Sequence, residues 1–593
     1  MTSDGDDESF ATAVAALYSP LHQSVSPESI ARAAARRVGT VTDMRVYLQR
    51  AELHTIARNS DSVTSSNVPR THPRIIHVTG TKGKGSVCCL CECILRERFG
   101  LRTGLFTSPH LVDVRERIRV QGKPVSPDVF AHAYWRIRSR LEAFRNTNIG
   151  GDGVGDDEDL PTLPGYFRML TLMALYVFYH YEPRIDVIVL EVGMGGRYDA
   201  TNILDLDLYD VRCGITQLDY DHVRVLGNTL EEIAWEKGGI FKVHKADNAN
   251  VTLKPHSAEA ATKQEIIDFS LATTDHASED DSGNTRGHIF FALDTNSPSA
   301  LQVLHDCARI EGRGVTLQLV GVADAESSHH QKRSGYTMLP DSCLIGLPGS
   351  HQRLNAQLAI TLCESLSLSG KDKAKSIQDR GVDVMFDALS RASWPGRCQT
   401  VEVPEQSMTL RLDGAHTVQS IKVGYNWFKL QQKDCNNSRN ILIFNCSHER
   451  DPVELLDLLD CEMFTAAFFC RADSERPSAV VKASAQDLLQ RSGRVVRQDL
   501  LPNTQATWQE TLESLWNHRC EQTPHRSEIS MTTASNLSVS QALKQIRKSQ
   551  YAGEHSEVLV TGSLYLVGSV LNAVKWSERE ADGKLQDLIT CCL

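Results

Sequence analysis

The fold of this chain is decided by one stretch, His77-Val78-Thr79-Gly80-Thr81-Lys82-Gly83-Lys84-Gly85-Ser86. It stands between a short β-rich run, Arg74 to Thr79, and a helical segment, Ser86 to Phe99, where a phosphate-binding loop belongs. Glycines let backbone N–H groups turn toward phosphate oxygens, and the N-terminus of the following helix adds partial positive charge. We therefore predict a nucleotide phosphate site made of Gly80, Thr81, Lys82, Gly83, Lys84, Gly85 and Ser86.

Two side chains of this loop have the chemistry to act on a nucleotide. Lys84 can reach the β- and γ-phosphates, and the Ser86 hydroxyl can lie near a metal ion. The spacing departs from the strict GxxxxGK[ST] pattern, because Val78 stands at the first glycine position and Gly85 separates the lysine from the serine. A plain glycine-rich turn is the alternative. The paired lysines, the glycines and the hydroxyl between a strand and a helix favour the phosphate site.

Strand and helix patterns alternate outward from the loop. Ile185 to Val192 is a near-continuous apolar run, which is typical of a strand buried on both faces of a parallel sheet. Val211 to Leu218 is a second such strand, and helical periodicity runs from Phe167 to Phe178. This alternation predicts an α/β fold whose N-terminal domain is a P-loop-type ATPase built on a parallel sheet.

A second set of strands is expected beyond Arg397, at Met408 to Leu412, Ile441 to Asn445, Ala466 to Cys470 and Glu557 to Thr561. Each run ends in small or polar residues, as strands do where a parallel sheet delivers a site. A chain of 593 residues also exceeds the usual size of one core. We predict one domain at residues 1–388 and a smaller, Rossmann-like α/β domain at 389–593. Polar insertions at 148–159, 278–286 and 522–540 are expected to be surface loops without assigned chemistry.

Composition narrows the class of protein. The net charge of -11 disfavours a nucleic-acid surface, which needs concentrated positive charge. The apolar runs are too short to cross a membrane, and the acidic start, Met1 to Glu8, does not resemble a leader sequence. The 16 cysteines are scattered without a disulfide framework. We therefore expect a cytoplasmic protein with no nucleic-acid partner and no membrane insertion.

The pair Cys88 and Cys91 forms a CxxC motif, with Cys89 and Cys93 interleaved. A metal or redox site is one interpretation. No second pair with zinc-ligand spacing follows, and the segment lies in the helix after the phosphate loop. The pattern therefore favours small buried hydrophobic residues.

The phosphate loop resembles the GTxGKG[ST] loop of the Mur ligase superfamily, which includes folylpolyglutamate synthases and dihydrofolate synthases. Further blocks resemble that family in the same order along the chain. They are Thr107 to Leu111 with Arg115 to Ile118, Leu163 to Phe178, Leu190 to Asn202, Asp219 to Gly227, Glu236 to Ile240, Trp394 to Gln399, Leu412 to Thr417 and Val560 to Tyr565. The resemblance assigns ATP and folate to the first domain and glutamate ligation to the second.

The resemblance implies a magnesium centre with two ions. Glu191 and Ser108 match the family's ligands, and His222 matches the histidine of the second ion. Magnesium prefers hard oxygen ligands and binds through few carboxylates plus phosphates. A salt-bridged core carboxylate is the alternative for Glu191, and an ordinary surface loop residue is the alternative for His222.

Lys237 is similar to the lysine that the superfamily carbamylates with CO₂. A carbamate converts a cation into an oxygen ligand, which helps two metal ions to lie close together. An ion pair with Glu236 or Glu232 is the alternative. Gly238 stands where the family commonly has alanine, which is expected to loosen the turn. A monovalent cation is a further candidate cofactor.

Other family positions lie in the second half of the chain. Asn355 matches an adenine contact, Arg397 a phosphate contact and Asp413 a ribose contact. Their structural alternatives are a helix cap or interhelical hydrogen bond for Asn355 and a surface salt bridge for Arg397. His416 and Ser563 are candidates for binding glutamate or the acyl phosphate, or are turn residues.

The resemblance implies an ATP-dependent ligase that adds L-glutamate to the γ-carboxylate of tetrahydrofolate polyglutamates through an acyl phosphate. Lys84, Lys237 and His416 are the expected catalytic residues. Dihydrofolate synthase, which joins dihydropteroate to glutamate, is the alternative, although the blocks around Tyr166 and Trp394 favour the polyglutamate enzyme. A non-catalytic scaffold is disfavoured because the phosphate and metal residues are all present. We expect a monomer, with a mitochondrial pool arising from an alternative start.

Overall fold

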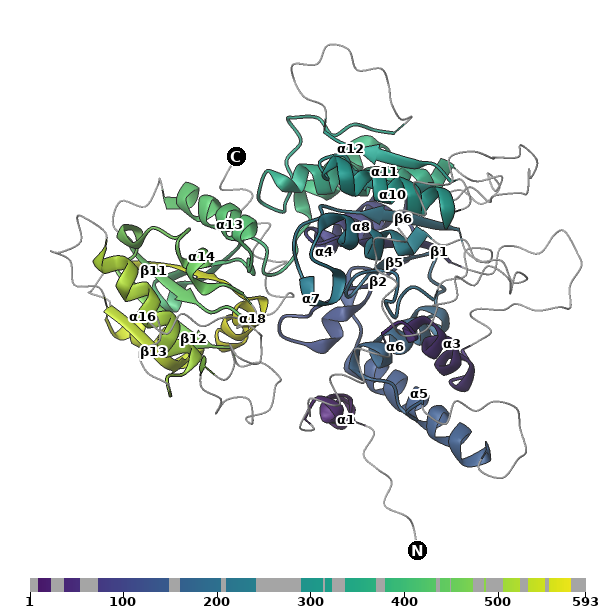
Figure 1. The fold of residues 1–593 in the computed structure, drawn as a ribbon, viewed down its shortest axis with the longest axis horizontal. Coiled ribbons are helices and arrows are strands. Elements are labelled where there is room, and N and C mark those ends of the chain that lie inside the picture. The colour runs from purple at the N-terminus through teal and green to yellow at the C-terminus, as the bar shows by residue number, and fades with distance from the viewer. Residues whose placement is uncertain are drawn as a thin grey trace, which may run out of the picture.

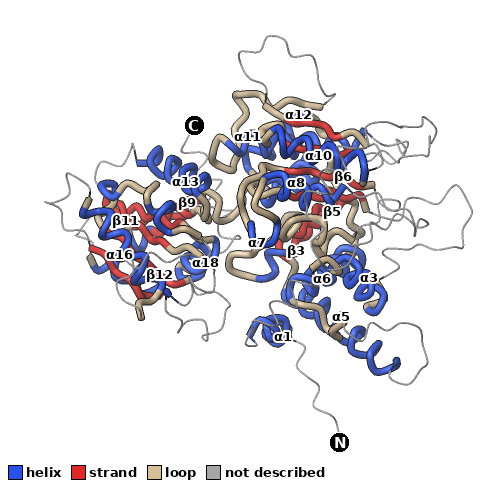
Figure 2. The backbone as a smooth tube through the Cα atoms, in the orientation of Figure 1, coloured by secondary structure: helices blue, strands red, loops and turns tan. Residues whose placement is uncertain are grey.

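The computed structural model describes residues 9–22, 37–53, 73–148, 160–203, 210–241, 289–312, 315–322, 336–368, 379–432, 438–447, 450–472, 485–486, 505–522, 532–549 and 554–576. These residues form two distinct lobes (Figure 1). Each lobe has a central sheet with helices outside it (Figure 2). The predicted α/β class is confirmed.

The N-terminal lobe is built on an eight-stranded sheet with the order β4-β3-β2-β5-β1-β6-β7-β8. The strands β2, β5, β1, β6, β7 and β8 run parallel to one another. At the β2 end of the sheet, β3 pairs antiparallel with β2, and β4 pairs antiparallel with β3. Their bounds are β1 Arg74–Thr79, β2 Thr103–Phe106, β3 Ile118–Val120, β4 Lys123–Pro124, β5 Val187–Glu191, β6 Val211–Ile215, β7 Ile289–Leu293 and β8 Leu317–Val320. The three strands predicted here from apolar runs are confirmed as β1, β5 and β6.

Helices cover both faces of this sheet. One face packs against α4 (Lys84–Glu97), α11 (His351–Leu368) and α12 (Val382–Arg391). The core on the other face includes α6 (Tyr166–His180), α8 (Leu230–Gly238) and α10 (Pro298–Ile310). This core extends away from the sheet through α5 (Pro127–Asn148), which packs on α6, and through α1 (Phe10–His22) and α3 (Thr40–Arg50), which pack on α5. Short turns of helix lie at η2 (Val114–Arg117), α7 (Val223–Leu226) and η3 (Gly239–Phe241).

The helix α4 confirms the interpretation of the CxxC motif. Cys88 and Cys91 are fully buried in the apolar core between α4 and α11, and burial raises the pKa of both thiols. Within the described ranges, no three histidine, cysteine or acidic side chains are grouped to hold a metal ion. These cysteines act as small hydrophobic residues.

The C-terminal lobe has a six-stranded sheet with the order β13-β12-β11-β14-β10-β9, parallel except for β9. Its strands are β9 Gln399–Val403, β10 Met408–Leu412, β11 Ser438–Phe444, β12 Ala466–Arg471, β13 Thr532–Ser538 and β14 His555–Thr561. Its helices are α13 Val418–Gln431, α14 Pro452–Leu456, α16 Trp508–Glu521, α17 Val539–Lys548 and α18 Leu564–Ala573, with short turns η4 Pro404–Gln406 and η6 Cys461–Met463. The four strands predicted in this region are confirmed.

One predicted loop is wrong. Within 522–540, residues Thr532–Ser538 form β13, which pairs in parallel with β12 at the edge of the sheet, and α17 starts at Val539. The strand is polar because it is only partly buried at this edge, so composition alone resembled a loop. Of the predicted insertion at 148–159, the structure describes only Asn148, which is the last residue of α5, and the predicted insertion at 278–286 lies outside the described residues.

The predicted division at residue 388 cuts through α12. Leu389 and Ala392 are buried with the first lobe, so its core extends a few residues further, and β9 starts the second sheet at Gln399. No helix in the described ranges is long and apolar enough to cross a membrane.

Candidate active site

Four neighbouring parallel strands, β2, β5, β1 and β6, end at the same edge of the first sheet. The segments that follow them carry predicted site residues from four places in the sequence. Ser108 follows β2, Glu191 ends β5, the phosphate loop follows β1, and His222 follows β6. Because parallel strands present their carboxyl ends together, the topology gathers these residues at one rim.

The phosphate loop is held against its surroundings at two glycines. Gly80 has φ +148°, and a Cβ there would lie 1.8 Å from Oγ1 of Thr216. Gly83 has φ +86° at the N-cap of α4, and a Cβ there would lie 2.5 Å from Oδ1 of Asn355. The loop therefore needs glycine at both positions, for space as well as for backbone conformation.

The loop is also anchored to the segment after β6. The backbone N–H groups of Thr81 and Lys82 both donate to the carbonyl oxygen of Gln217, over 2.9 and 3.1 Å. Oγ1 of Thr81 donates to the carbonyl oxygen of Asp219 over 3.0 Å. The phosphate loop and the loop that carries His222 are thus one connected unit.

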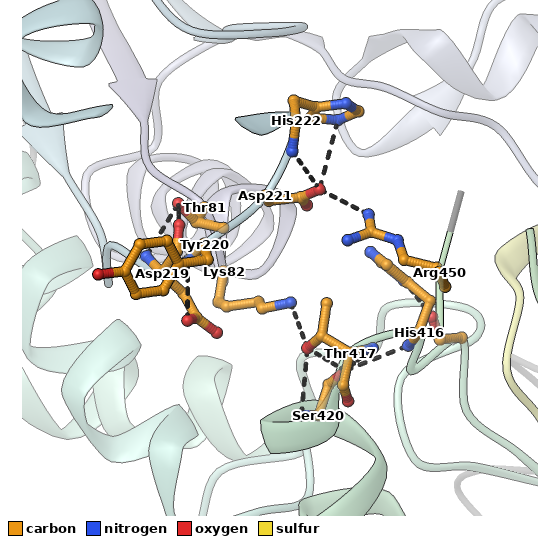
Figure 3. A network of polar contacts seen from close by, with 11 residues as sticks. Thr81, Lys82, Asp219, Tyr220, Asp221, His222, His416, Thr417, Ser420 and Arg450 are labelled. Carbon is orange, nitrogen blue, oxygen red and sulfur yellow. Dashed lines mark hydrogen bonds and ion pairs between the residues drawn. The ribbon is translucent and has the colours of Figure 1, made fainter. Parts of the chain in front are cut away.

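The two lysines of the loop point to different places. Lys84 is the first residue of α4, and its charge favours the ionised carboxylate of Glu191. Lys82 extends to the other lobe, where Nζ donates to Oγ1 of Thr417 over 2.5 Å (Figure 3). Burial lowers the pKa of Lys82 to about 8. The phosphate role of Lys84 stays a prediction, whereas the ammonium of Lys82 contacts the hydroxyl of Thr417.

Glu191 is a buried carboxylate, 4% exposed. Its Oε2 accepts a hydrogen bond from the backbone N–H of Ser108 over 3.0 Å. Burial raises the pKa of Glu191, while Lys84, that N–H group and Arg397 oppose the rise. Since its carboxylate makes no ion pair within the described ranges, the alternative of a salt-bridged core residue is disfavoured. Ser86, also buried, has its Oγ 3.4 Å from Nε2 of Gln352.

His222 lies at the rim with left-handed backbone, φ +50°, and a side chain that is 47% exposed. The backbone N–H of His222 donates to Oδ1 of Asp221 over 2.8 Å. The same oxygen accepts from Nη2 of Arg450, in the other lobe, over 2.5 Å. Burial opposes ionisation of Asp221, but His222, Arg450 and Lys82 outweigh it and hold its pKa well below the usual range.

Lys237 reaches this rim from α8, whose N-cap Thr229 forms a capping box with Glu232. The lysine is 4% exposed, and Nζ donates to the carbonyl oxygen of Gly80 over 2.8 Å. Burial, and next the charge of Lys84, lower the pKa of Lys237 to about 7. A large fraction of this amine is therefore neutral near physiological pH.

The ion pair considered for Lys237 does not form. The carboxylate of Glu236 instead accepts hydrogen bonds from Nη1 and Nη2 of Arg37, over 2.9 and 2.6 Å. Glu232 is the capping-box acceptor for the backbone N–H of Thr229. Both carboxylates are engaged elsewhere, so that alternative is wrong.

The sequence suggested that Gly238 loosens the turn, but the structure gives this glycine a packing role. A Cβ at this position would lie 2.8 Å from Sγ of Cys307 on α10. The glycine lets α8 and α10 approach closely, which fixes the helix that carries Lys237.

Strand ends of the second lobe supply further predicted residues. Asp413 follows β10 and accepts backbone N–H groups of Cys398 and Ala415, over 2.8 and 2.9 Å. His416 follows in the same turn, with Nδ1 2.8 Å from the carbonyl oxygen of Gly414. A carbonyl only accepts, so Nδ1 carries the hydrogen and Nε2 keeps its lone pair. Burial lowers the pKa of His416 to about 4, which keeps the ring neutral.

Three predicted residues remain, one on the first lobe and two on the second. Asn355, on α11, borders Gly83 and donates from Nδ2 to Oε1 of Gln352 over 2.9 Å. Arg397 lies near Gly414 and close enough to Glu191 to influence its charge. Ser563 is the N-cap of α18 but makes no side-chain capping hydrogen bond.

Several residues of the rim were not assigned a role from sequence, namely Asp221, Gln352, Thr417 and Arg450. The sequence feature that could have pointed to Arg450 is the polar run that follows the apolar strand ending at Phe444, since such runs often carry site residues. Asp221 and Thr417 each stand next in sequence to a predicted site residue, His222 and His416 respectively. Hydrogen-bonding partners across two lobes are not visible in such local patterns.

The fold and the rim define a two-lobed α/β protein with a phosphate loop. Solved structures share this fold. Mycobacterium tuberculosis folylpolyglutamate synthase complexed with ADP and AMPPCP has a TM-score of 0.58 and 19% identity, covering 91% of this chain and 96% of that one. The bifunctional folylpolyglutamate synthase/dihydrofolate synthase of Yersinia pestis complexed with AMPPNP and Mn has a TM-score of 0.57 and 22% identity, covering 97% and 100%.

Sequence relatives give the family, although no family model matches the chain. The putative folylpolyglutamate synthase of Caenorhabditis elegans is 31% identical over 551 residues, 90% of this chain and 89% of the relative. The Homo sapiens mitochondrial enzyme is 34% identical over 417 residues, 67% of this chain but 58% of the relative. The chain belongs to the folylpolyglutamate synthase family. It spans less than two thirds of the length of the mammalian relatives that it matches.

Proposed function

We propose that this chain is an ATP-dependent ligase that adds L-glutamate to the γ-carboxylate of tetrahydrofolate polyglutamates, with ADP and phosphate as the other products. One observation carries the proposal. The phosphate loop, Glu191 and the amine of Lys237 converge at one sheet edge, and His416 of the second lobe lies across from them. Family membership supplies the substrate class.

The chemistry follows from the poor reactivity of a carboxylate. Transfer of the γ-phosphoryl group of ATP to a carboxylate oxygen gives ADP and an acyl phosphate, which has a good leaving group. The neutral amine of glutamate attacks the acyl carbon, phosphate leaves, and the amine loses a proton. Lys84 is assigned to the β- and γ-phosphates and the glycine-rich backbone to orienting them, so that catalysis is mainly positioning and charge stabilisation.

The second lobe is assigned to the incoming glutamate. His416 presents an unprotonated Nε2, and its low pKa makes it a poor base. We therefore assign it to orienting the amine by accepting a hydrogen bond rather than to storing its proton. Arg397 and Asp413 are assigned to the phosphates and the ribose, Asn355 to adenine, and Ser563 to glutamate or the acyl phosphate.

The chain's residues fit a divalent metal ion of the magnesium type. Glu191 is a buried carboxylate that forms no ion pair with any residue the structure describes, and Ser108 and His222 lie at the same edge. When bound, magnesium would neutralise charge on the phosphates. A buried carboxylate with no cation partner otherwise carries a desolvation cost, so the donor set supports the assignment. A second ion and a monovalent cation stay predictions.

Carbamylation of Lys237 is part of the proposal. Only a neutral amine reacts with CO₂, and the lowered pKa of Lys237 supplies one at neutral pH. Its Nζ donates to a backbone carbonyl of the phosphate loop, and among the described residues no carboxylate forms an ion pair with it. The carbamate would place oxygen donors beside the metal residues.

A cytosolic location, a monomeric state and a mitochondrial pool from an alternative start stay predictions. The cysteines in the described ranges are all free thiols, which suits a reducing compartment.

The acceptor distinguishes the proposal from dihydrofolate synthase. Steady-state rates of glutamate incorporation should be compared with tetrahydrofolate and with dihydropteroate as acceptor. We expect kcat/KM to be higher for tetrahydrofolate and its polyglutamates. Activity on dihydropteroate alone would refute the assignment.

A further inference from the structure

Two polar contacts join the lobes at the active-site rim, and the proposed roles do not account for them. Nη2 of Arg450 lies 2.5 Å from Oδ1 of Asp221, and Nζ of Lys82 lies 2.5 Å from Oγ1 of Thr417. Figure 3 shows both contacts in one network, with Lys82 and Asp221 on the first lobe and Thr417 and Arg450 on the second. We call these four residues the interlobe clamp.

The Asp221 contact acts on the loop that carries His222. One carboxylate oxygen accepts both the backbone N–H of His222 and the guanidinium of Arg450. Asp221 and Arg450 side chains are 11% and 21% exposed, so the ion pair is largely shielded from water and ions. His222 has a left-handed backbone, which an unrestrained loop rarely keeps at a non-glycine residue. Arg450 therefore helps to hold the conformation that presents His222 at the rim.

The Lys82 contact acts on the turn that carries His416. Thr417 is the N-cap of α13, and its Oγ1 lies 2.9 Å from Oγ of Ser420. The same serine hydroxyl accepts the backbone N–H of His416 over 3.1 Å. A contact from Lys82 to Thr417 therefore ties the phosphate loop, through a few hydrogen bonds, to the turn that presents His416.

We propose that the interlobe clamp positions the two half-sites for ligation, with Lys82 and Arg450 as positioning residues; this inference rests on the proposed function. An acyl phosphate formed on the first lobe has two fates. Attack by the amine of glutamate gives the amide, phosphate and a proton, whereas attack by water returns the carboxylate and releases phosphate. The clamp favours the first fate, because it holds the amine-binding lobe against the lobe that carries the acyl phosphate.

The ratio of ADP formed to glutamate incorporated measures this choice in the full chain. The variants are Arg450→Gln, Asp221→Asn and their double variant, since asparagine keeps an oxygen that can accept the N–H of His222. Arg519→Gln is the matched control, because Arg519 makes an ion pair of the same 2.5 Å length with Asp457 inside the second lobe. We expect the ratio to stay near the wild-type value in the control and to rise at least fivefold in each single variant.

The double variant tests whether the two residues act as a pair. If they do, its ratio should be close to that of the single variants, because removing either partner already breaks the contact. Ratios that multiply in the double variant, or that stay at the wild-type value in the single variants, would overturn the clamp. Arg450→Lys keeps the charge and should recover most of the coupling.

Amide hydrogen exchange with AMPPCP gives a readout that needs no product. Exchange in residues 80–86 and 219–227 should quicken in Arg450→Gln and not in Arg519→Gln, while the rest of the first lobe keeps its protection. Equal exchange in the two variants would overturn the clamp. A wild-type chain that elongates no folate would instead refute the proposed function, and the exchange experiment would still decide the clamp.

Discussion

Nζ of Lys237 lies 2.8 Å from the carbonyl oxygen of Gly80, so a buried lysine on α8 contacts the first residue of the phosphate loop. The contact links two segments that lie 157 residues apart in the chain. A buried ammonium with a carbonyl partner pays a desolvation cost that a carboxylate partner would have offset. The site therefore favours the neutral amine, which is the form that can be carbamylated.

Carbamylation of Lys237 should increase with pH around neutrality. Since its pKa is lowered to about 7, the neutral fraction of the amine rises from about a tenth at pH 6 to about nine tenths at pH 8. At a fixed concentration of dissolved ¹³CO₂, a carbamate carbon signal should grow over this range by NMR. Lys237→Arg should lack that signal and most of the ligase activity. A wild-type enzyme that is fully active without any carbamate signal would contradict the assignment.

Lys84→Ala should leave a folded protein with little ligase turnover. The variant removes the cation at the start of α4 that we assign to the β- and γ-phosphates, while the backbone of the loop remains. Circular dichroism should match the wild type, and kcat should fall by much more than tenfold. A loss within tenfold, about 1.4 kcal/mol in the barrier, would show that the phosphate loop is misassigned.

Gly83→Ala should damage the loop both by strain and by a clash. A left-handed backbone costs a residue with a side chain about 1–2 kcal/mol, and the added Cβ would also meet Asn355. Gly381→Ala is the matched control for strain, because its φ is +99° and no atom of the described residues lies within 4 Å of its Cβ. Urea unfolding and AMPPCP titration should show a larger loss for Gly83→Ala, with nucleotide affinity lowered only there. Equal effects would mean that contact with Asn355 is unimportant.

His416 should make stability depend on pH below neutrality. Its folded pKa is about 4 and its ordinary value is 6.5, so the unfolded chain binds more protons between these values. The free energy of unfolding should therefore fall as the pH drops from 6.5 toward 4. His416→Asn should reduce this fall by about 2 kcal/mol between pH 7 and pH 5 in urea unfolding. An unchanged pH dependence would indicate that folding does not lower the pKa of His416.

The fold was predictable where strands carry apolar runs buried on both faces. β1 and β10 have the predicted bounds, because such runs end abruptly at glycine or polar residues. β13 was missed because an edge strand needs no apolar pattern, and Thr532–Ser538 is mostly polar. The apolar pattern of a segment predicts which strands are buried. It does not predict a strand that is stabilised mainly by backbone hydrogen bonds to its neighbour.

The candidate site was predictable only in part. Resemblance identified Glu191, His222 and Lys237, and the sheet topology brings them to one rim. It could not show that Glu236 pairs with Arg37, or that Lys82 extends to the second lobe. Those contacts depend on side-chain directions in three dimensions, and no spacing in the sequence encodes them.

The measurement that tests the central claim most directly uses tetrahydrofolate with both oxygens of its γ-carboxylate labelled with ¹⁸O. The chain is incubated with this acceptor, ATP, magnesium and L-glutamate, and the folate and phosphate are analysed by mass spectrometry. We predict a folate longer by one glutamate, together with inorganic phosphate that carries one ¹⁸O atom per molecule, because that oxygen leaves with the phosphate of the acyl phosphate. Elongated folate with unlabelled phosphate, or labelled AMP, would contradict the account.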